Sequence, residues 1–165
     1  MERRQQRRSA SALPGLDIAE QKSWQNYLNA TLRSHAAMNR QLTGEHQLRL
    51  VDLRVLSIIA GSADGSVRMG DVADAMESMP ARVTKRVRRL EERGLVRREM
   101  FPGDRRGVMA VITDEGRAMV ARATATYERG VRTHVLGALS HAQMAAIATN
   151  CRRIKSASKP SRPTA

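Results

Sequence analysis

The chain has 165 residues and a net charge of +13, because 29 lysine and arginine residues outnumber 16 acidic ones. Such an excess of positive charge favours a polyanionic partner, either nucleic acid or an anionic membrane surface. No apolar run approaches the roughly 20 residues that span a bilayer, and none follows the arginine-rich start as in a secretory leader. We therefore expect a cytoplasmic protein with no membrane among its partners.

Residue types that carry catalytic or metal chemistry are sparse. The single cysteine, Cys151, can form neither an internal disulfide nor a cysteine-rich metal site, and the four histidines lack ligand spacing. No Ser/His/Asp set, glycine-rich phosphate loop or close carboxylate pair stands out. Four aromatic residues are too few for the usual base-stacking platform of RNA-binding proteins. The sequence predicts a mostly helical binding protein that is not an enzyme and holds no cofactor and no metal.

The first 16 residues show no helical or strand periodicity and predict a disordered basic arm. Asp17 and Glu20 then match a capping box, and apolar residues recur every three or four positions. This pattern predicts a long first helix over about 17–42. One small domain cannot cover so long an apolar stripe, so we expect part of it to form an inter-subunit surface.

Two shorter helices and a third, amphipathic one follow. A very apolar helix is predicted over about 50–60, and residues 69–76 have helical spacing. Pro80 suits the first turn of a helix that runs to Arg93, and Gly94 provides a stop signal. A short helix, a tight turn and a second helix in this order predict a helix-turn-helix.

A β-hairpin is predicted next. The β-rich runs 95–101 and 108–113 surround a six-residue basic tip over 102–107, and Val67-Arg68 leaves room for a short third strand. The tip segment Asp104-Arg105-Arg106 lies between Pro-Gly and Gly, so we expect it to project. An arginine on a narrow tip suits the minor groove of DNA, and an acid two residues earlier can hold its guanidinium in one rotamer.

Two helices complete the chain. Thr113 is the predicted cap of a helix that runs to about residue 137, and Ser140 with Gln143 forms a capping box for the last helix. The spacing of that last helix predicts four side chains that turn inward: Met144, Ile147, Cys151 and Ile154.

The helix over 80–93 carries the pattern that bears most directly on function. Val83, Val87 and Leu90 fall within about 60° on a helical wheel. The other side is mainly basic, a face that suits the DNA major groove, where arginine and lysine reach guanine O6 and N7. A merely solvated charged face is the alternative. The neighbouring short helix and hairpin, and ten basic against four acidic residues over 80–106, favour DNA.

In this order and spacing, the chain resembles the MarR family of winged helix-turn-helix transcription regulators over about residues 20–155. The family pattern contains V-T-R, R-L-E-x-x-G-L-V-x-R, D-x-R and L-T-x-x-G. The matching segments are Val83-Thr84-Lys85, Arg89-Leu90-Glu91-Glu92-Arg93-Gly94-Leu95-Val96-Arg97-Arg98, Asp104-Arg105-Arg106-Gly107 and Ile112-Thr113-Asp114-Glu115-Gly116.

The resemblance implies a mainly α fold with a small β-wing: a winged helix-turn-helix head on an interleaved helical dimerisation region. It divides the chain into five parts. These are a disordered basic arm (1–16), a first dimerisation helix (17–47), a winged helix-turn-helix DNA-binding domain (48–113), C-terminal dimerisation helices (114–155) and a flexible tail (156–165).

The resemblance also implies a homodimer that binds a pseudo-palindromic operator in double-stranded DNA, with half-sites about one helical turn apart. It implies a repressor that a small phenolic or anionic effector releases. Carried over by position, the recognition-helix contacts would be Ala81, Arg82, Thr84, Lys85 and Arg88. The wing contacts would be Asp104, Arg105 and Arg106, with Arg106 as the wing-tip arginine and Asp104 as its orienting acid.

Some features depart from the family pattern or stay open. Ala81 stands where many members have serine, and Arg49 stands where a capping threonine or serine often opens the second helix, so that cap must come from elsewhere. The candidates to line an effector cavity are also ordinary core positions: His35, Met38, Leu56 and Met119. A non-specific architectural or nucleoid DNA-binding protein is the alternative function, and the +13 charge supports it.

Overall fold

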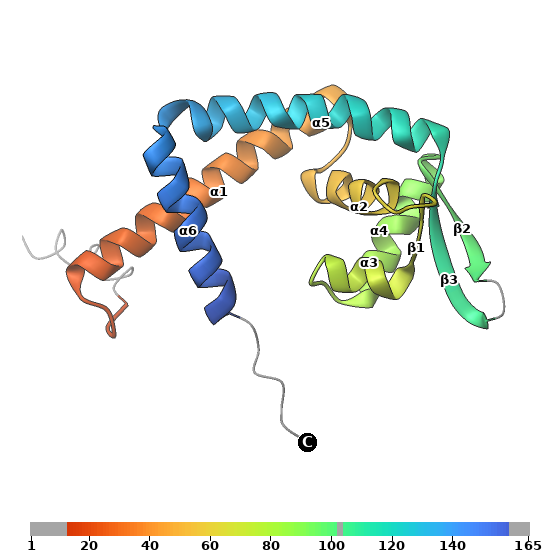
Figure 1. The fold of residues 1–165 in the computed structure, drawn as a ribbon, viewed down its shortest axis with the longest axis horizontal. Coiled ribbons are helices and arrows are strands. Elements are labelled where there is room, and N and C mark those ends of the chain that lie inside the picture. Colours follow the sequence, from red (N-terminus) through yellow and green to blue (C-terminus); the bar gives the residue numbers. More distant parts are fainter. Residues whose placement is uncertain (1–12, 102–103, 159–165) are drawn as a thin grey trace, which may run out of the picture. The chain divides into compact units, whose positions relative to one another are not determined.

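The computed structural model describes residues 13–101 and 104–158. The described chain divides into two compact units, one that ends at Ala37 and one that begins at Met38. The elements, in chain order, are α1 (Ile18–His46), α2 (Leu50–Ala60), β1 (Ser66–Arg68), α3 (Met69–Ala75), α4 (Pro80–Glu92), β2 (Val96–Phe101), β3 (Asp104–Ile112), α5 (Asp114–His134), the short 3-10 helix η3 (Leu136–Ala138) and α6 (His141–Ala157) (Figure 1).

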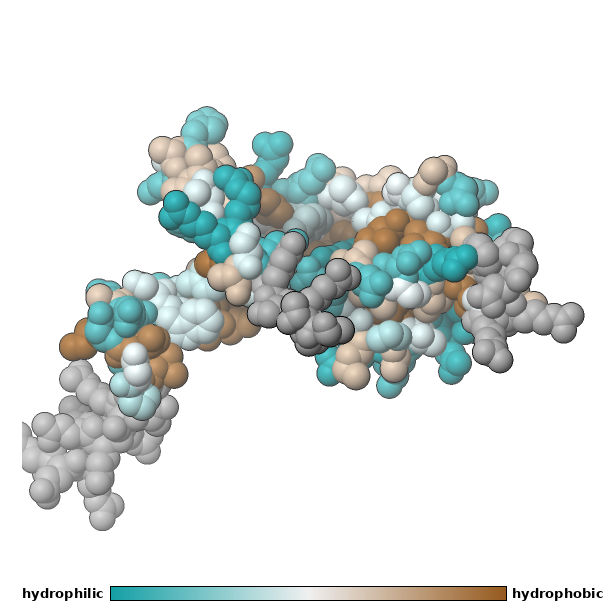
Figure 2. Space-filling model, turned by 60° about the horizontal axis from the view of Figure 1, so that its bottom comes forward, coloured by the Kyte–Doolittle hydropathy of each residue, from teal (hydrophilic) through white to brown (hydrophobic). Residues whose placement is uncertain are grey.

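The first unit contains the N-terminal two thirds of α1. The predicted capping box is confirmed, because the Asp17 amide donates to Glu20 Oε2 at 2.9 Å and the Glu20 amide donates to Asp17 Oδ1 at 2.8 Å. The rings of Trp24 and Tyr27 lie 5.9 Å apart and stay about half exposed. Leu32 of the same helix is exposed as well, and brown patches at the lower left of Figure 2 mark hydrophobic residues on this surface. The single chain therefore leaves the stripe of α1 open to solvent.

The second unit has its core where α2, α3 and α4 pack against a three-stranded antiparallel sheet with the order β1-β3-β2 (Figure 1). In the sheet, Val67 of β1 and Arg98 of β2 both pair with Ala110 of β3. The buried core side chains of these elements and of the turn between α4 and β2 include Leu53, Leu56, Ile59, Val72, Val83, Val87, Leu90, Leu95, Val96, Ala110 and Ile112. The predicted mainly α fold with a small β-wing is confirmed.

The second strand of the hairpin begins earlier than predicted, although its pairing is irregular there. Strand β3 already begins at Asp104, opposite Phe101, so the expected six-residue tip over 102–107 is wrong. The regular ladder ends at Met100 opposite Val108. The further pair of Phe101 with Asp104 is made by backbone groups, which the alternation of side chains does not reveal. Between Met100 and Phe101 the partner on β3 changes from Val108 to Asp104, which is a register irregularity.

Other boundaries also differ from the predicted ones for physical reasons. Helix α1 continues past the expected end at residue 42 to His46, where polar contacts to α5 replace the apolar stripe. The start of α2 obtains its cap from Asn39 of α1, whose Oδ1 accepts a hydrogen bond from the Leu50 amide at 3.0 Å. This Asn39 contact supplies the cap that Arg49 could not provide.

The C-terminal helices start as predicted. Thr113 Oγ1 accepts from the Gly116 amide at 3.0 Å, and the Ser140 amide donates to Gln143 Oε1 at 2.8 Å. Helix α5 ends at His134, a little before the predicted residue 137. The inward turn predicted for the last helix is wrong within this chain, because Met144 is only half buried and Ile147, Cys151 and Ile154 are exposed.

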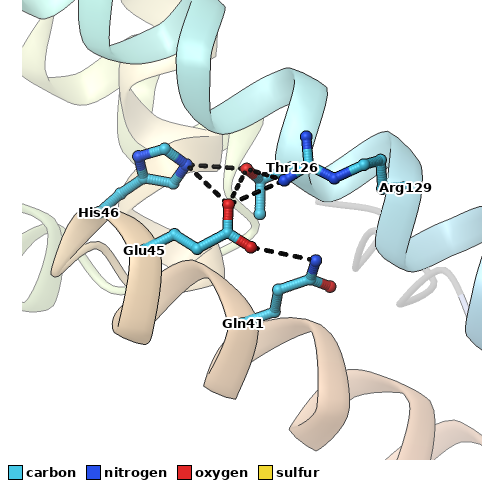
Figure 3. A network of polar contacts seen from close by, with 5 residues as sticks. All are labelled: Gln41, Glu45, His46, Thr126 and Arg129. Carbon is cyan, nitrogen blue, oxygen red and sulfur yellow. Dashed lines mark hydrogen bonds and ion pairs between the residues drawn. The ribbon is translucent and has the colours of Figure 1, made fainter.

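A cluster of polar contacts joins the end of α1 to the middle of α5 (Figure 3). The buried Thr126 hydroxyl donates to Glu45 Oε2 at 2.8 Å and also lies 2.8 Å from His46 Nε2. Gln41 Nε2 donates to Glu45 Oε1 at 3.2 Å, and the Arg129 guanidinium donates to Glu45 Oε2 at 2.8 Å. The hydrogen bond from Thr126, then that from Gln41 and the charge of Arg129, lower the pKa of Glu45 below its usual 4.5.

Replacing Thr126 with valine should raise the pKa of Glu45 toward its usual value, because the largest stabilising contact of the carboxylate is lost. A lowered folded-state pKa contributes stability above the unfolded value of about 4.5, and this contribution disappears as the pH falls through the folded pKa. The stability deficit of Thr126→Val should therefore be largest near neutral pH and shrink in acid. Carboxyl NMR titration and denaturant unfolding at several pH values measure both effects. An unchanged Glu45 pKa in the variant would contradict the assignment.

Gly116 lies in the first turn of α5, where another part of the chain approaches too closely for a side chain. A Cβ atom on Gly116 would clash with the Leu95 carbonyl oxygen and would lie 2.7 Å from Ile112 Cδ1. The first turn of α5 thus touches the backbone at the start of the wing, and only a residue without a side chain fits there.

Gly116→Ala should therefore destabilise the protein by about 2–3 kcal/mol, because backbone atoms cannot move aside as a flexible side chain can. Gly70→Ala in α3 is the matched control, since a Cβ atom there has nothing within 4 Å. The control should be neutral or slightly stabilising, by at most about 1 kcal/mol. Urea unfolding compares the two variants, and equal stabilities would show that the close approach does not matter.

Candidate nucleic-acid interface

The recognition helix predicted over 80–93 is α4, and its two faces are as the sequence indicates. Pro80 occupies the first turn after Met79, where its missing N–H costs nothing. Val83, Val87 and Leu90 are each at most 2% exposed and fix the inner face in the core. The outer face is therefore held toward solvent as one rigid surface.

All five predicted recognition-helix residues lie on the exposed side of α4: Ala81, Arg82, Thr84, Lys85 and Arg88. The Thr84 hydroxyl donates to the Pro80 carbonyl at 3.0 Å, so this hydroxyl keeps only acceptor capacity for another partner. Within the part of the chain that the structure describes, the side chains of Arg82, Lys85 and Arg88 have no hydrogen-bond or ion-pair partner. These three cations are available to an outside anion.

Two further arginines of this segment point elsewhere, which sequence reasoning missed. Arg86 pairs with Asp52 of α2, and Arg93 at the C-cap donates to the backbone carbonyls of His46 and Gln47. A signal for Arg86 was present in the sequence. It lies three residues after Val83, beside the apolar stripe, and a charge there needs a partner.

The wing is tied to the end of α4 by two residues of the family pattern. Glu91 Oε2 accepts from Arg98 Nε at 2.7 Å, and Glu91 Oε1 accepts from the Arg98 amide at 3.1 Å. Thr113 Oγ1 also donates to the Gly94 carbonyl at 2.7 Å. Direct hydrogen bonds therefore join the wing, the end of α4 and the start of α5.

The predicted wing contacts Asp104, Arg105 and Arg106 lie on β3, at the strand end next to the hairpin turn. Their side chains fall outside the described part of the structure, so the orienting role expected of Asp104 stays a prediction.

A pocket of about 440 Å³ opens beside α4, between the start of α3 and the wing. Its lining residues are Arg68, Met69, Gly70, Asp71, Thr84, Arg98, Gly107 and Val108. The predicted effector residues lie elsewhere. Leu56 is in the core of the second unit and Met119 packs against that core, while Met38 is buried on α1 and His35 is exposed in the first unit. Their effector role stays a prediction.

No helix in the described ranges is long and apolar enough to cross a bilayer. Across the same ranges, no three metal-binding side chains gather into a cluster.

Comparison with known proteins agrees with this geometry. The MarR family model matches residues 46–107. Sco3205 of Streptomyces coelicolor, a MarR family transcriptional regulator solved in complex with DNA, is 30% identical over 91% of this chain and 94% of that chain, with a TM-score of 0.85. AbsC from the same organism, also a MarR family regulator, is 25% identical over 86% of this chain and 95% of that one, with a TM-score of 0.80.

A third similar structure is BpsR of Bordetella bronchiseptica, described with a mechanism for regulation of its DNA binding by 6-hydroxynicotinic acid. It is 24% identical over 81% of this chain and 98% of that one, with a TM-score of 0.70, and supports the fold alone. A search of curated proteins gives no significant match.

The fold and the basic helix face define a winged-helix protein. The chain belongs to the MarR family of transcriptional regulators.

Proposed function

We propose that this protein is a cytoplasmic, homodimeric repressor, and not an enzyme, that binds a pseudo-palindromic operator in double-stranded DNA. One observation carries the proposal: Arg82, Lys85 and Arg88 are exposed and unpartnered within the described residues, on a helix whose opposite face is buried. Three free cations on one rigid face have the spacing and charge that the major groove accepts. The DNA-bound structure of the relative Sco3205 supports the DNA-binding part of the proposal.

Each recognition face is proposed to use α4 in the major groove, with Ala81 and Thr84 beside the three cations. The wing residues Asp104, Arg105 and Arg106 are proposed to reach the adjoining minor groove. Phosphate contacts then supply most of the affinity, and contacts to base edges supply the sequence preference.

A second copy of the chain is proposed to cover the apolar side chains that α1 and α6 leave exposed. Ile18 is 86% exposed and Leu32 is 58% exposed on α1, and Ile147 and Ile154 are about half exposed on α6. Uncovered apolar stripes of this size mark association surfaces. Helices from 17–47 and 114–155 would form the dimerisation region around the head at 48–113, with 1–16 and 156–165 as arm and tail.

Leu28→Glu should break the dimer, because a carboxylate placed in the centre of the apolar stripe of α1 cannot be buried without a partner. Light scattering after size exclusion should give half the native mass, and operator binding should fall with it. Asn26→Glu adds the same charge on the opposite side of the helix and should leave the dimer intact. A dimer that tolerates Leu28→Glu would rule out this stripe as the interface.

A small phenolic or anionic effector is proposed to release the protein from DNA. The candidates to contact it are His35, Met38, Leu56 and Met119. The regulation of BpsR by 6-hydroxynicotinic acid shows that a protein of this fold responds to such a molecule.

Operator binding by α4 and the wing can be tested with an operator sequence that the protein selects from a random DNA pool. Fluorescence anisotropy then compares the affinity for this operator with the affinity for random DNA. Lys85→Ala or Arg88→Ala should relax preference at particular bases by about 1–3 kcal/mol. Arg106→Ala should weaken binding to all sequences with little loss of preference. Lys22→Ala on α1 removes one charge outside the proposed interface and should change neither property.

The alternative is a non-specific architectural DNA-binding protein, which the +13 charge favours. A preference below about tenfold for every selected sequence would establish this alternative, since specific regulators typically reach roughly 10³-fold or more.

A further inference from the structure

Arg86 lies on the recognition helix but faces the protein. Its Nη1 atom is 2.7 Å from Asp52 Oδ1 of α2, and the two side chains are only 24% and 17% exposed. The second oxygen of Asp52 accepts the Arg49 amide at 3.3 Å, at the N-terminus of α2. Asp52 therefore holds both the start of α2 and the middle of α4.

Arg93 makes a second attachment to the same region. Its Nη1 atom donates to the Gln47 carbonyl at 2.8 Å, and its Nη2 atom donates to the His46 carbonyl at 3.2 Å. Gln47 has a φ of 52°, an uncommon conformation for a residue other than glycine. Both arginines therefore contact residues 46–52, which we call the α1–α2 junction.

Two attachments restrain a helix in a way that apolar packing cannot. Arg86 and Arg93 are seven residues apart, which is two helical turns along one face. Burial of Val83, Val87 and Leu90 is non-directional and leaves small rotations about the helix axis inexpensive. Directed hydrogen bonds at two points along the axis fix that rotation.

The junction is itself held from its other side. The His46 side chain contacts Thr126 of α5, and Glu45 beside it binds Thr126 and Arg129 (Figure 3). The point to which α4 is attached is therefore a fixed part of the fold.

We propose that Arg86 and Arg93 are positioning residues for DNA recognition: they fasten α4 to the α1–α2 junction and set the direction in which Arg82, Lys85 and Arg88 meet the bases. This inference rests on the proposed function, in which α4 reads an operator. It separates the cations of the helix into those that contact DNA and those that orient the helix.

The test uses Asp52→Asn and Arg86→Gln in the full-length protein, with binding to selected operator and to random DNA measured against salt. Asparagine keeps an oxygen to accept the Arg49 amide and removes only the charge that holds Arg86. Both variants should weaken operator binding by roughly tenfold and leave random-DNA affinity and its salt slope unchanged. The double variant should be no worse than either single one, because both remove the same pair. Arg86→Lys should keep most of the operator preference.

Arg106→Ala on the wing is the comparison for a contact that does not read sequence, and it should weaken binding to all DNA and reduce the salt slope by about one. Arg93→Ala should behave as Arg86→Gln does. If Arg86→Gln instead behaves as Arg106→Ala does while Asp52→Asn has no effect, Arg86 contacts phosphate and the positioning role is wrong.

Thermal unfolding of each variant confirms that binding is measured on folded protein. Asp52→Asn is the mildest change and decides the question if Arg86→Gln does not fold. A wild-type protein without operator preference would overturn the proposed function. A wild-type protein that has this preference and keeps it in Asp52→Asn would overturn only the positioning role.

Discussion

The buried stripe of α4 is the constraint on which the proposed DNA-binding arrangement depends. Val83, Val87 and Leu90 are almost completely buried, and three such side chains contribute roughly 5 kcal/mol or more in apolar burial. This burial forces Arg82 and Lys85 outward, although like charges on one helix face repel each other. The core thus provides the free energy that keeps a cationic surface assembled before any DNA arrives.

Polar contacts at the borders of α4 add direction to that burial. Glu91 and Arg98 join the end of the helix to the wing, and Thr113 joins the following turn to α5. Each contact involves a charged group or a backbone carbonyl, so each depends on geometry more steeply than apolar packing does. The two parts of the molecule proposed to read the two DNA grooves therefore keep a fixed relation to each other within one unit.

Much of this fold could be predicted because its signals are local. The caps at Thr113 and Ser140 depend on residues three positions apart, and the apolar periodicity of α4 depends on a single helix. Contacts between distant segments could not be predicted from one sequence. The Asn39 cap of α2 and the pairing of Arg86 with Asp52 join residues 11 and 34 positions apart. The outward cations of the candidate site followed from periodicity, and so could the inward position of Arg86, but the residues that Arg86 and Arg93 contact could not.

The absence of any buried residue along α6 within the described chain has a consequence for how the protein behaves in the cell. A helix that buries nothing in its own subunit gains little free energy from folding alone, because most helical stability comes from packing. In the proposed homodimer, that packing comes from the other subunit, and mass action then governs it. The C-terminal helix would then be ordered when the protein concentration is high enough for dimers. When dilution separates the two subunits, the helix would be open to proteases.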